Sequence, residues 1–135
     1  MGIIFDTSTL IGLERASLSL EKLVKGRDSE PFGISMISVS ELLHAVHRAD
    51  SEARREQREA FVEKILEIFP LYPFDLSASR VYARFWGQFI KKGVVVGTHD
   101  LMIASTCLSL GFSVLTAEIR DYRKIEGLRI EELLA

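Results

Sequence analysis

Residues 98–118 read THDLMIASTCLSLGFSVLTAE and contain the clearest helix-to-strand transition of the chain. The pattern predicts a helix over 99–110 that begins after Thr98 and ends at Gly111. Apolar residues lie on nearly all sides of this helix, which indicates that it is central and buried. The segment that follows, FSVLT at 112–116, is short and apolar, and such runs are typical of strands inside a parallel sheet.

On both sides of this segment, strands and helices alternate. Short apolar runs predict strands near 1–5, 32–36, 71–72, 112–116 and 128–130. Apolar spacing predicts helices near 10–13, 18–25, 38–48, 52–69, 76–92 and 99–110, with one helical turn after Asp121. This alternation predicts an α/β protein in which a parallel sheet is flanked by helices on both faces. With no internal repeat and no linker, residues 1–135 are expected to form a single domain.

Several predicted helices begin with capping signals. One of the hydroxyl residues at 7–9 is expected to cap the first helix. Ser38 is expected to begin another, because SVSE at 38–41 has the form of a capping box. Asp75 or Ser77 is expected to cap the helix that ends near residue 92.

The composition limits the possible functions. Hydrophobic residues make up 47% of the chain, enough for a core, and the formal net charge is -2. A protein that holds nucleic acid by broad electrostatics would be basic, so any nucleic-acid contact must depend on a local site. The single cysteine, Cys107, lies in an apolar run and is expected to be buried. No segment resembles a signal peptide or a membrane helix, so we expect a cytoplasmic protein without membrane contact.

Acidic residues recur where the predicted strands end. Asp6 follows the first strand, Glu41 and Asp100 lie in the first turns of predicted helices, and Glu118 and Asp121 follow the fourth strand. Each acid alone has a structural explanation as a cap or as a partner of a helix dipole. However, the carboxyl ends of parallel strands share one edge of the sheet, where ligands bind. We therefore expect these acids to meet in space.

A group of acids needs a compensating charge. Two carboxylates about 4 Å apart repel by about 4 kcal/mol at an effective dielectric constant of about 20. Oxygen ligands suit Mg²⁺ or Mn²⁺. Such an ion can activate water and screen a phosphodiester, so the residue types favour metal-dependent phosphodiester hydrolysis, with Asp6, Glu41 and Asp100 as ligands.

Four segments carry a family resemblance: IIFDTSTLIGL, ISVSELLHA, THDLMIASTCLSLGFSVLTAE and RDYRKIEGL. In this order they resemble the motifs of PIN-domain ribonucleases, in particular the VapC-like toxins of VapBC toxin–antitoxin pairs, over about residues 3–128. The resemblance implies a PIN-like fold and an endoribonuclease that cuts RNA, such as tRNA or rRNA, with Mg²⁺ or Mn²⁺. It also implies a homodimer, and an antitoxin whose tail covers the active site.

The resemblance assigns roles to individual residues. The three acids of the family fall on Asp6, Glu41 and Asp100, which would be catalytic and metal-binding. The hydroxyl residue beside the first acid falls on Thr7 or Ser8.

The later positions match less closely. Thr116 corresponds to the threonine that ends the fourth strand. The fourth acidic position usually holds Asn or Asp, but here it falls on Glu118, with Asp121 as the alternative. Separately from the resemblance, Arg80 and Arg84 share one side of a predicted helix and are candidates for contacts with RNA phosphates.

Other side chains give weaker signals. His44 and His47 share a helix face but have no partners that would complete a zinc site. His99 is expected to point away from the position of Asp100. Arginines at 54–58 alternate with glutamates, which predicts an exposed, salt-bridged helix.

Alternative functions remain open. A phosphoacceptor domain would need adjacent acids at the first strand and a lysine after a late strand, where this chain has Ala117 and Glu118. A phosphatase of the haloacid-dehalogenase type would need a second Asp at the position of Ser8. A non-catalytic RNA- or protein-binding module that keeps the fold is the third alternative, and the intact acids at Asp6, Glu41 and Asp100 argue against it.

Overall fold

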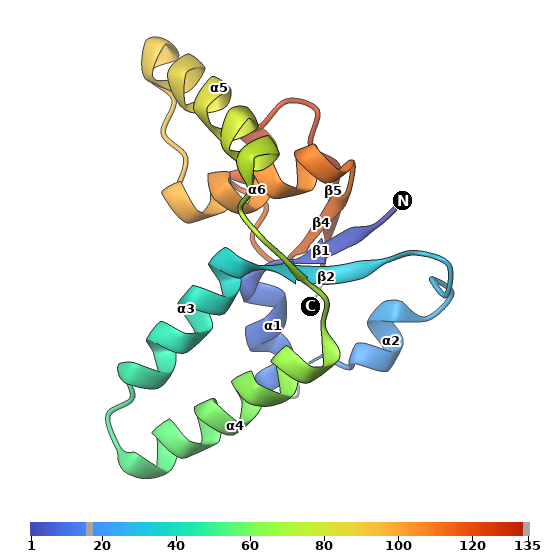
Figure 1. Cartoon of the computed structure of the whole chain (residues 1–135), viewed down its shortest axis with the longest axis vertical. Helices are drawn as coiled ribbons and strands as arrows, with labels where there is room; N and C mark the ends of the chain where they lie inside the picture. The colour runs from blue at the N-terminus through green and yellow to red at the C-terminus, as the bar shows by residue number, and fades with distance from the viewer. Residues whose placement is uncertain (16–17, 134–135) are drawn as a thin grey trace.

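The computed structural model describes residues 1–15 and 18–133 as a central sheet with helices on both sides (Figure 1). Each paired strand runs parallel to its neighbours, in the order β3-β2-β1-β4-β5. The strands are β1 Ile3–Phe5, β2 Phe32–Ser35, β3 Leu71–Tyr72, β4 Ser113–Thr116 and β5 Ile130–Glu132. The helices are α1 Thr7–Glu14, α2 Leu20–Val24, α3 Met36–His47, α4 Glu52–Ile68, α5 Leu76–Lys92 and α6 Thr98–Leu110, with the 3-10 turn η1 Tyr122–Lys124. The predicted α/β class is confirmed.

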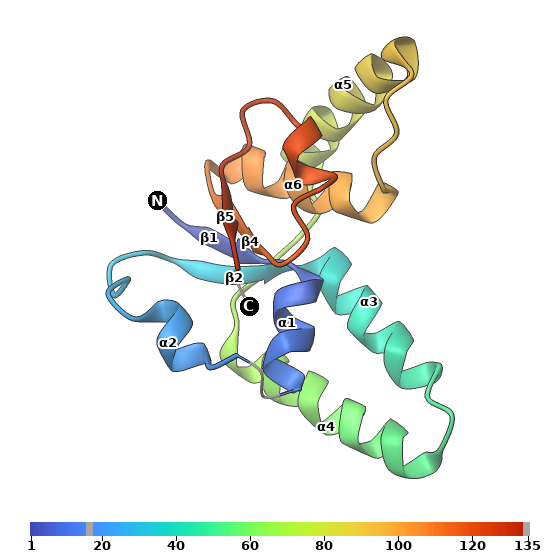
Figure 2. The same ribbon diagram turned by 180° about the vertical axis from the view of Figure 1, so that it is seen from behind.

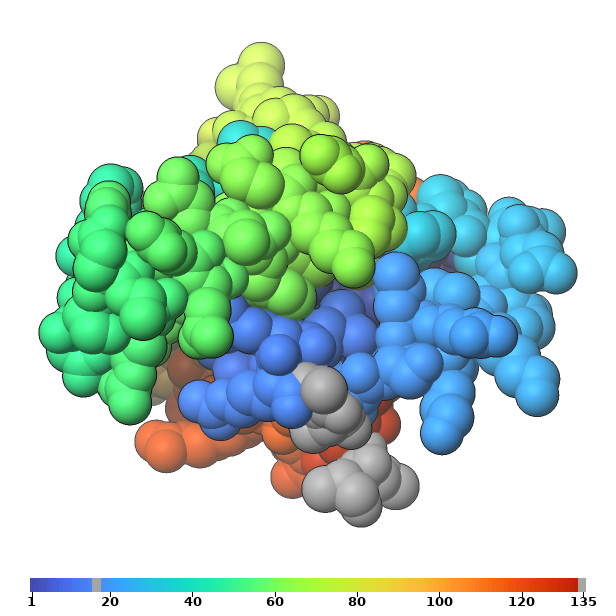
Figure 3. Space-filling view, turned by 90° about the horizontal axis from the view of Figure 1, so that it is seen from below, coloured from blue at the N-terminus to red at the C-terminus, as the bar shows by residue number. Residues whose placement is uncertain are grey.

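The sheet separates two hydrophobic cores, because successive side chains of a strand point to opposite faces. In β1, Ile3 and Phe5 belong to the core under α1 to α4, and Ile4 belongs to the core under α5 and α6. The view from behind shows the same two layers (Figure 2). Seen from below, α4, α1 and α2 form the surface of the first layer (Figure 3).

The helix α6 has the buried position that its sequence predicts. Its residues Leu101 and 103–107 are buried, and the apolar ones among them belong to the second core. Gly111 ends the helix with φ of 70°, a left-handed conformation that favours glycine. Burial raises the pKa of the Cys107 thiol well above its ordinary value, as expected for a structural cysteine.

Two expected helix starts were wrong. Asp6, not one of the hydroxyl residues at 7–9, caps α1 by accepting a hydrogen bond from the backbone three residues on. The helix α3 begins at Met36 and is capped by Ser35, so Ser38 lies buried inside the helix and no capping box forms there. In both places the strand passes directly into the helix, and the cap therefore falls on the residue at the strand end.

The helix α5 packs mainly on α6 and extends away from the sheet (Figure 1). Asp75 caps it and Gly93 ends it, as predicted. Its outer side exposes large apolar side chains: 53% of Trp86 and 68% of Ile90 are accessible. Among the described helices, none has the length and apolar character needed to cross a membrane.

Candidate active site

Asp6 lies at the end of β1 and is buried, with 4% of its surface exposed. Its Oδ1 accepts hydrogen bonds from the Ser8 hydroxyl at 2.7 Å and from the Thr9 N–H at 3.1 Å. Its Oδ2 accepts a hydrogen bond from the Thr116 hydroxyl at 2.6 Å. A carboxylate is costly to bury unless its oxygens are hydrogen-bonded, so these donors hold Asp6 in place at the sheet edge.

Ser8 and Thr116, both expected to support the site, connect the ends of β1 and β4. The Thr116 hydroxyl oxygen accepts the Glu118 N–H at 2.9 Å, and the Ser8 hydroxyl oxygen accepts the Ala117 N–H at 3.1 Å. Each hydroxyl proton can then point to Asp6. The network explains why hydroxyl residues follow both strands. The Thr9 hydroxyl also lies 3.2 Å from Asp6 Oδ1, but it makes its shorter hydrogen bond, of 2.8 Å, to the Leu115 carbonyl at the end of β4.

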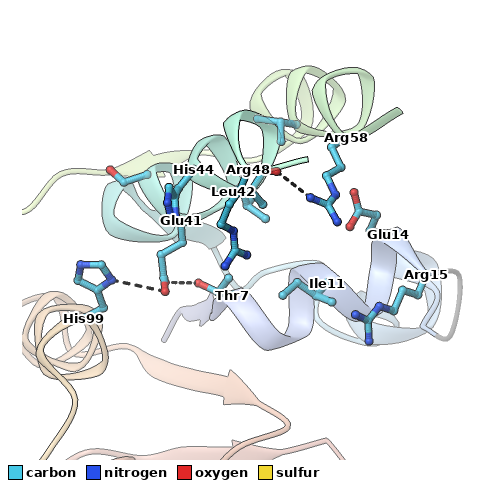
Figure 4. Close-up of a pocket in the computed structure, with 13 residues that line it drawn as sticks. Thr7, Ile11, Glu14, Arg15, Glu41, Leu42, His44, Arg48, Arg58 and His99 are labelled. Atoms are coloured by element: carbon cyan, nitrogen blue, oxygen red, sulfur yellow. Dashed lines mark hydrogen bonds and ion pairs between the residues drawn. The ribbon is translucent and has the colours of Figure 1, made fainter. Parts of the chain in front are cut away.

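Glu41 lies in the second turn of α3, because this helix begins two residues earlier than expected. Its Oε1 accepts a hydrogen bond from the Thr7 hydroxyl at 2.6 Å. The Nδ1 atom of His99 lies 3.5 Å from Glu41 Oε2 (Figure 4). His99 therefore turns toward the acids from the start of α6, a contact between distant segments that no local sequence signal predicts.

Asp100 lies half-buried in the first turn of α6. Burial raises its pKa to about 6, and the negative charges of Asp121, Asp6, Glu41 and Glu118 act in the same direction. Four other acids, from three separate parts of the chain, therefore lie close enough to act on Asp100. That Asp6, Glu41 and Asp100 together hold a metal ion stays a prediction.

Asp121 is held by specific contacts. Its Oδ2 accepts the Gly97 N–H at 2.9 Å, and Lys124 Nζ lies 3.4 Å from its Oδ1. These contacts hold the pKa of Asp121 below its ordinary value. A Cβ atom at Gly97 would lie 3.2 Å from Asp121 Oδ2 and 3.5 Å from Asp100 Oδ2, so the glycine leaves space beside both carboxylates. The Asp121 side chain does not cap η1, the helical turn that follows it, because it bonds Gly97 instead.

The remaining expected residues lie at the margin or elsewhere. Glu118 is exposed and is tied to the network through its backbone N–H. Arg80 and Arg84 lie exposed on α5, and the guanidinium carbon of Arg84 lies 5.3 Å from the centre of the Phe85 ring. An RNA-binding role for the two arginines stays a prediction.

The donor atoms fit a divalent ion that keeps much of its water. Among residues 1–15 and 18–133, no three His, Cys, Asp or Glu side chains form a ready-made metal site. However, Mg²⁺ commonly binds one or two carboxylates and completes its shell with water. The space beside Gly97, between Asp100 and Asp121, has oxygen donors of the right type. Buried Asp6 adds negative charge to the same edge of the sheet.

Tyr122 is 1% exposed and belongs to the second hydrophobic core. Within the described residues its hydroxyl has no hydrogen-bond partner. Burial, followed by the charges of Asp6 and Asp100, raises the pKa of the phenol well above its ordinary value. The hydroxyl therefore stays protonated, and its burial costs free energy.

A five-stranded parallel sheet with a cluster of acids at its carboxyl edge defines a class of α/β proteins suited to metal-assisted chemistry on phosphates. The PIN domain model matches residues 3–128. "Ribonuclease VapC1" of Rickettsia felis is 35% identical over 96% of this chain and 95% of its own length. "tRNA(fMet)-specific endonuclease VapC" of Salmonella typhimurium is 30% identical over 73% of each chain. The chain belongs to the PIN domain family, and within it to the VapC ribonucleases.

Solved structures agree with this assignment. One match is a chain of the DNA-bound VapBC complex from Salmonella typhimurium. It is 27% identical, the match covers 98% of both chains, and the TM-score is 0.86. A chain of VapBC2 from Rickettsia felis, at 22% identity, has the same fold with a TM-score of 0.85.

Proposed function

We propose that this protein is an endoribonuclease that uses Mg²⁺ or Mn²⁺ to hydrolyse RNA phosphodiester bonds, and that it acts as the toxin of a toxin–antitoxin pair. The proposal is supported by the negative charges of Asp6 and Glu41 that act on Asp100, in a chain 35% identical to a VapC ribonuclease. A group of acidic side chains repels an anionic substrate unless a bound cation compensates the negative charge.

In this proposal, Asp100 is the central metal ligand, Asp6 and Glu41 are the other two carboxylates of the site, and Asp121 borders the same space beside Gly97. Glu118 and Asp121 are alternatives for the fourth acid. When bound, the ion supplies positive charge that offsets the negative charge developing on the phosphodiester. The chain's own contribution is positioning: Thr116 and Ser8 orient Asp6, and Thr7 with His99 orients Glu41.

The test is a cleavage assay with purified protein, total tRNA and rRNA, in Mg²⁺, Mn²⁺ or chelator. Wild-type protein should cut RNA only with metal present. Asp6→Asn should fold, bind less metal and cut nothing, and it also controls for contaminating nuclease. Full activity of Asp6→Asn, or of wild type in chelator, would refute the assignment. Metal-free RNA binding without cleavage would instead favour the non-catalytic alternative.

The partners follow from the same relatives. One relative is named as specific for tRNA(fMet), and matching chains come from VapBC complexes. We therefore expect an RNA substrate such as tRNA and a cognate antitoxin. Expression of this chain alone should stop growth of its host, and expression of the product of a small neighbouring gene should restore growth. We place this activity in the cytoplasm, where tRNA is found.

A homodimer would cover the apolar side of α5. Leu76, Trp86 and Ile90 are all more than half exposed on that helix. Light scattering after gel filtration should give twice the mass of the chain, and Trp86→Glu should give the mass of one chain.

A further inference from the structure

A groove with arginines along its wall runs from the acids between α1, α3 and α4 (Figure 4). Its volume is about 500 Å³. Thr7, Glu41 and His99 line the end at the acidic site. Further along, the lining includes Arg15, Arg48 and Arg58, and we call this feature the arginine groove. Glu41 therefore faces both the acids and a basic surface.

The arginine side chains can take up a ligand. Figure 4 shows Arg48 and Arg58 pointing from α3 and α4 toward α1. Arg58 is fixed by one hydrogen bond, from Nη1 to the Ala45 carbonyl at 2.8 Å, which leaves its other N–H donors available to a ligand. Glu14 of α1 also lines the groove and lies beside Arg58 in Figure 4, but none of the ion pairs among the described residues includes Arg15, Arg48 or Arg58. The expectation that Arg58 belongs to an exposed, salt-bridged face was wrong, because it is half-buried and turned into the groove.

The groove continues beyond the three arginines. A second hollow of about 620 Å³ shares Glu14, Arg15 and Arg58 with it and adds Arg54, Gln57 and Phe61. Basic side chains and one aromatic ring thus follow a track away from the acids. Such a combination is typical of surfaces that hold single-stranded nucleic acid.

We propose that the arginine groove binds the phosphates of a single RNA strand next to the bond that is cut. This rests on the proposed ribonuclease function and extends it to the substrate path. A chain of net charge -2 needs a local basic surface to hold RNA, and this one begins at Glu41. Guanidinium groups bind phosphate through paired N–H donors.

The experiment measures binding of a fluorescent single-stranded RNA by anisotropy, in chelator, over a range of salt concentrations. Each phosphate contact contributes about 0.7 to the slope of log K against log salt concentration. Arg48→Ala and Arg15→Ala should each lower the slope by about 0.7 and weaken binding about fivefold at ~0.1 M salt. Arg48→Lys should retain most of the slope, because it keeps the charge.

Arg55→Ala is the matched control, since Arg55 lies exposed on α4, is paired with Glu52 and does not line the groove. It should leave slope and affinity unchanged. Unchanged binding by Arg48→Ala and Arg15→Ala, or no RNA binding by wild type, would overturn the inference. A third outcome would also overturn it: wild type binds polyglutamate more tightly than RNA of equal charge, and Arg48→Ala loses the polyglutamate binding. That result would assign the groove to an acidic protein partner. Cleavage by wild type in Mg²⁺ would leave the ribonuclease proposal standing in each case.

Discussion

Replacing Asp100 with asparagine should stabilise the metal-free protein at neutral and alkaline pH. The pKa of Asp100 is raised from 3.8 to about 6 in the folded chain, first by burial and then by the neighbouring acids. Below the unfolded-state pKa the carboxyl is neutral in both states, and its ionisation costs nothing. As the pH rises from 3.8 to about 6, the unfolded chain loses this proton while the folded chain keeps it, so stability is lost over this range and stays lower at higher pH. The neutral amide of the Asp100→Asn variant would avoid this loss.

The magnitude follows from the shift. A difference of about two pKa units corresponds to about 3 kcal/mol at most. Asp100 is only half-buried, so solvent screening reduces this to about 1.5 kcal/mol. The variant also loses the attraction between the carboxylate and the start of α6, about 0.5 kcal/mol. The net gain of about 1 kcal/mol corresponds to a Tm increase of about 4 °C for a chain of this size.

Thermal unfolding in chelator, at about pH 8 and about pH 3, tests this reasoning. Asp100→Asn should unfold about 4 °C above wild type at the higher pH, with no difference at the lower pH. Glu67→Gln removes an exposed acid that does not act on Asp100, and it should show no pH-dependent gain. With Mg²⁺ the order should reverse, because the ion stabilises wild type more than the variant. An equal Tm at both pH values would refute the argument.

Three further changes test the supporting contacts. Thr116→Val removes the 2.6 Å hydrogen bond to buried Asp6 and should lower the free energy of unfolding in urea by about 2 kcal/mol; a change near zero would show that this bond does not hold Asp6. Tyr122→Phe removes a buried hydroxyl that lacks a partner among the described residues and should raise the free energy of unfolding by about 1 kcal/mol, whereas a decrease would reveal a bound water. Asp121→Ala removes the acceptor for the Gly97 N–H, so hydrogen exchange there should become about tenfold faster, and an unchanged rate would contradict its anchoring role.

The element order and the acids could be predicted from the sequence because both depend on local signals. The spacing of apolar residues, the capping residues and the glycines that end helices are signals within a few residues. They predicted the bounds of α6, its end at Gly111 and the position of β4 to within one or two residues of the structure. The alternation of strands and helices then implied a parallel sheet, whose geometry collects the residues at strand ends. Asp6 and Asp100 needed no further information to be identified as candidates.

Tertiary structure alone decided which side chains meet those acids. The Thr116 hydroxyl that bonds Asp6 lies 110 residues away in the sequence, and His99 reaches Glu41 from another helix. Likewise, the sequence predicts Arg58 as one charge of an exposed helix, but in the folded chain α4 packs beside α3 and Arg58 lines the groove. Local sequence propensity does not predict such contacts, because they depend on how helices pack across a sheet. A small change in helix position would give each side chain a different neighbour.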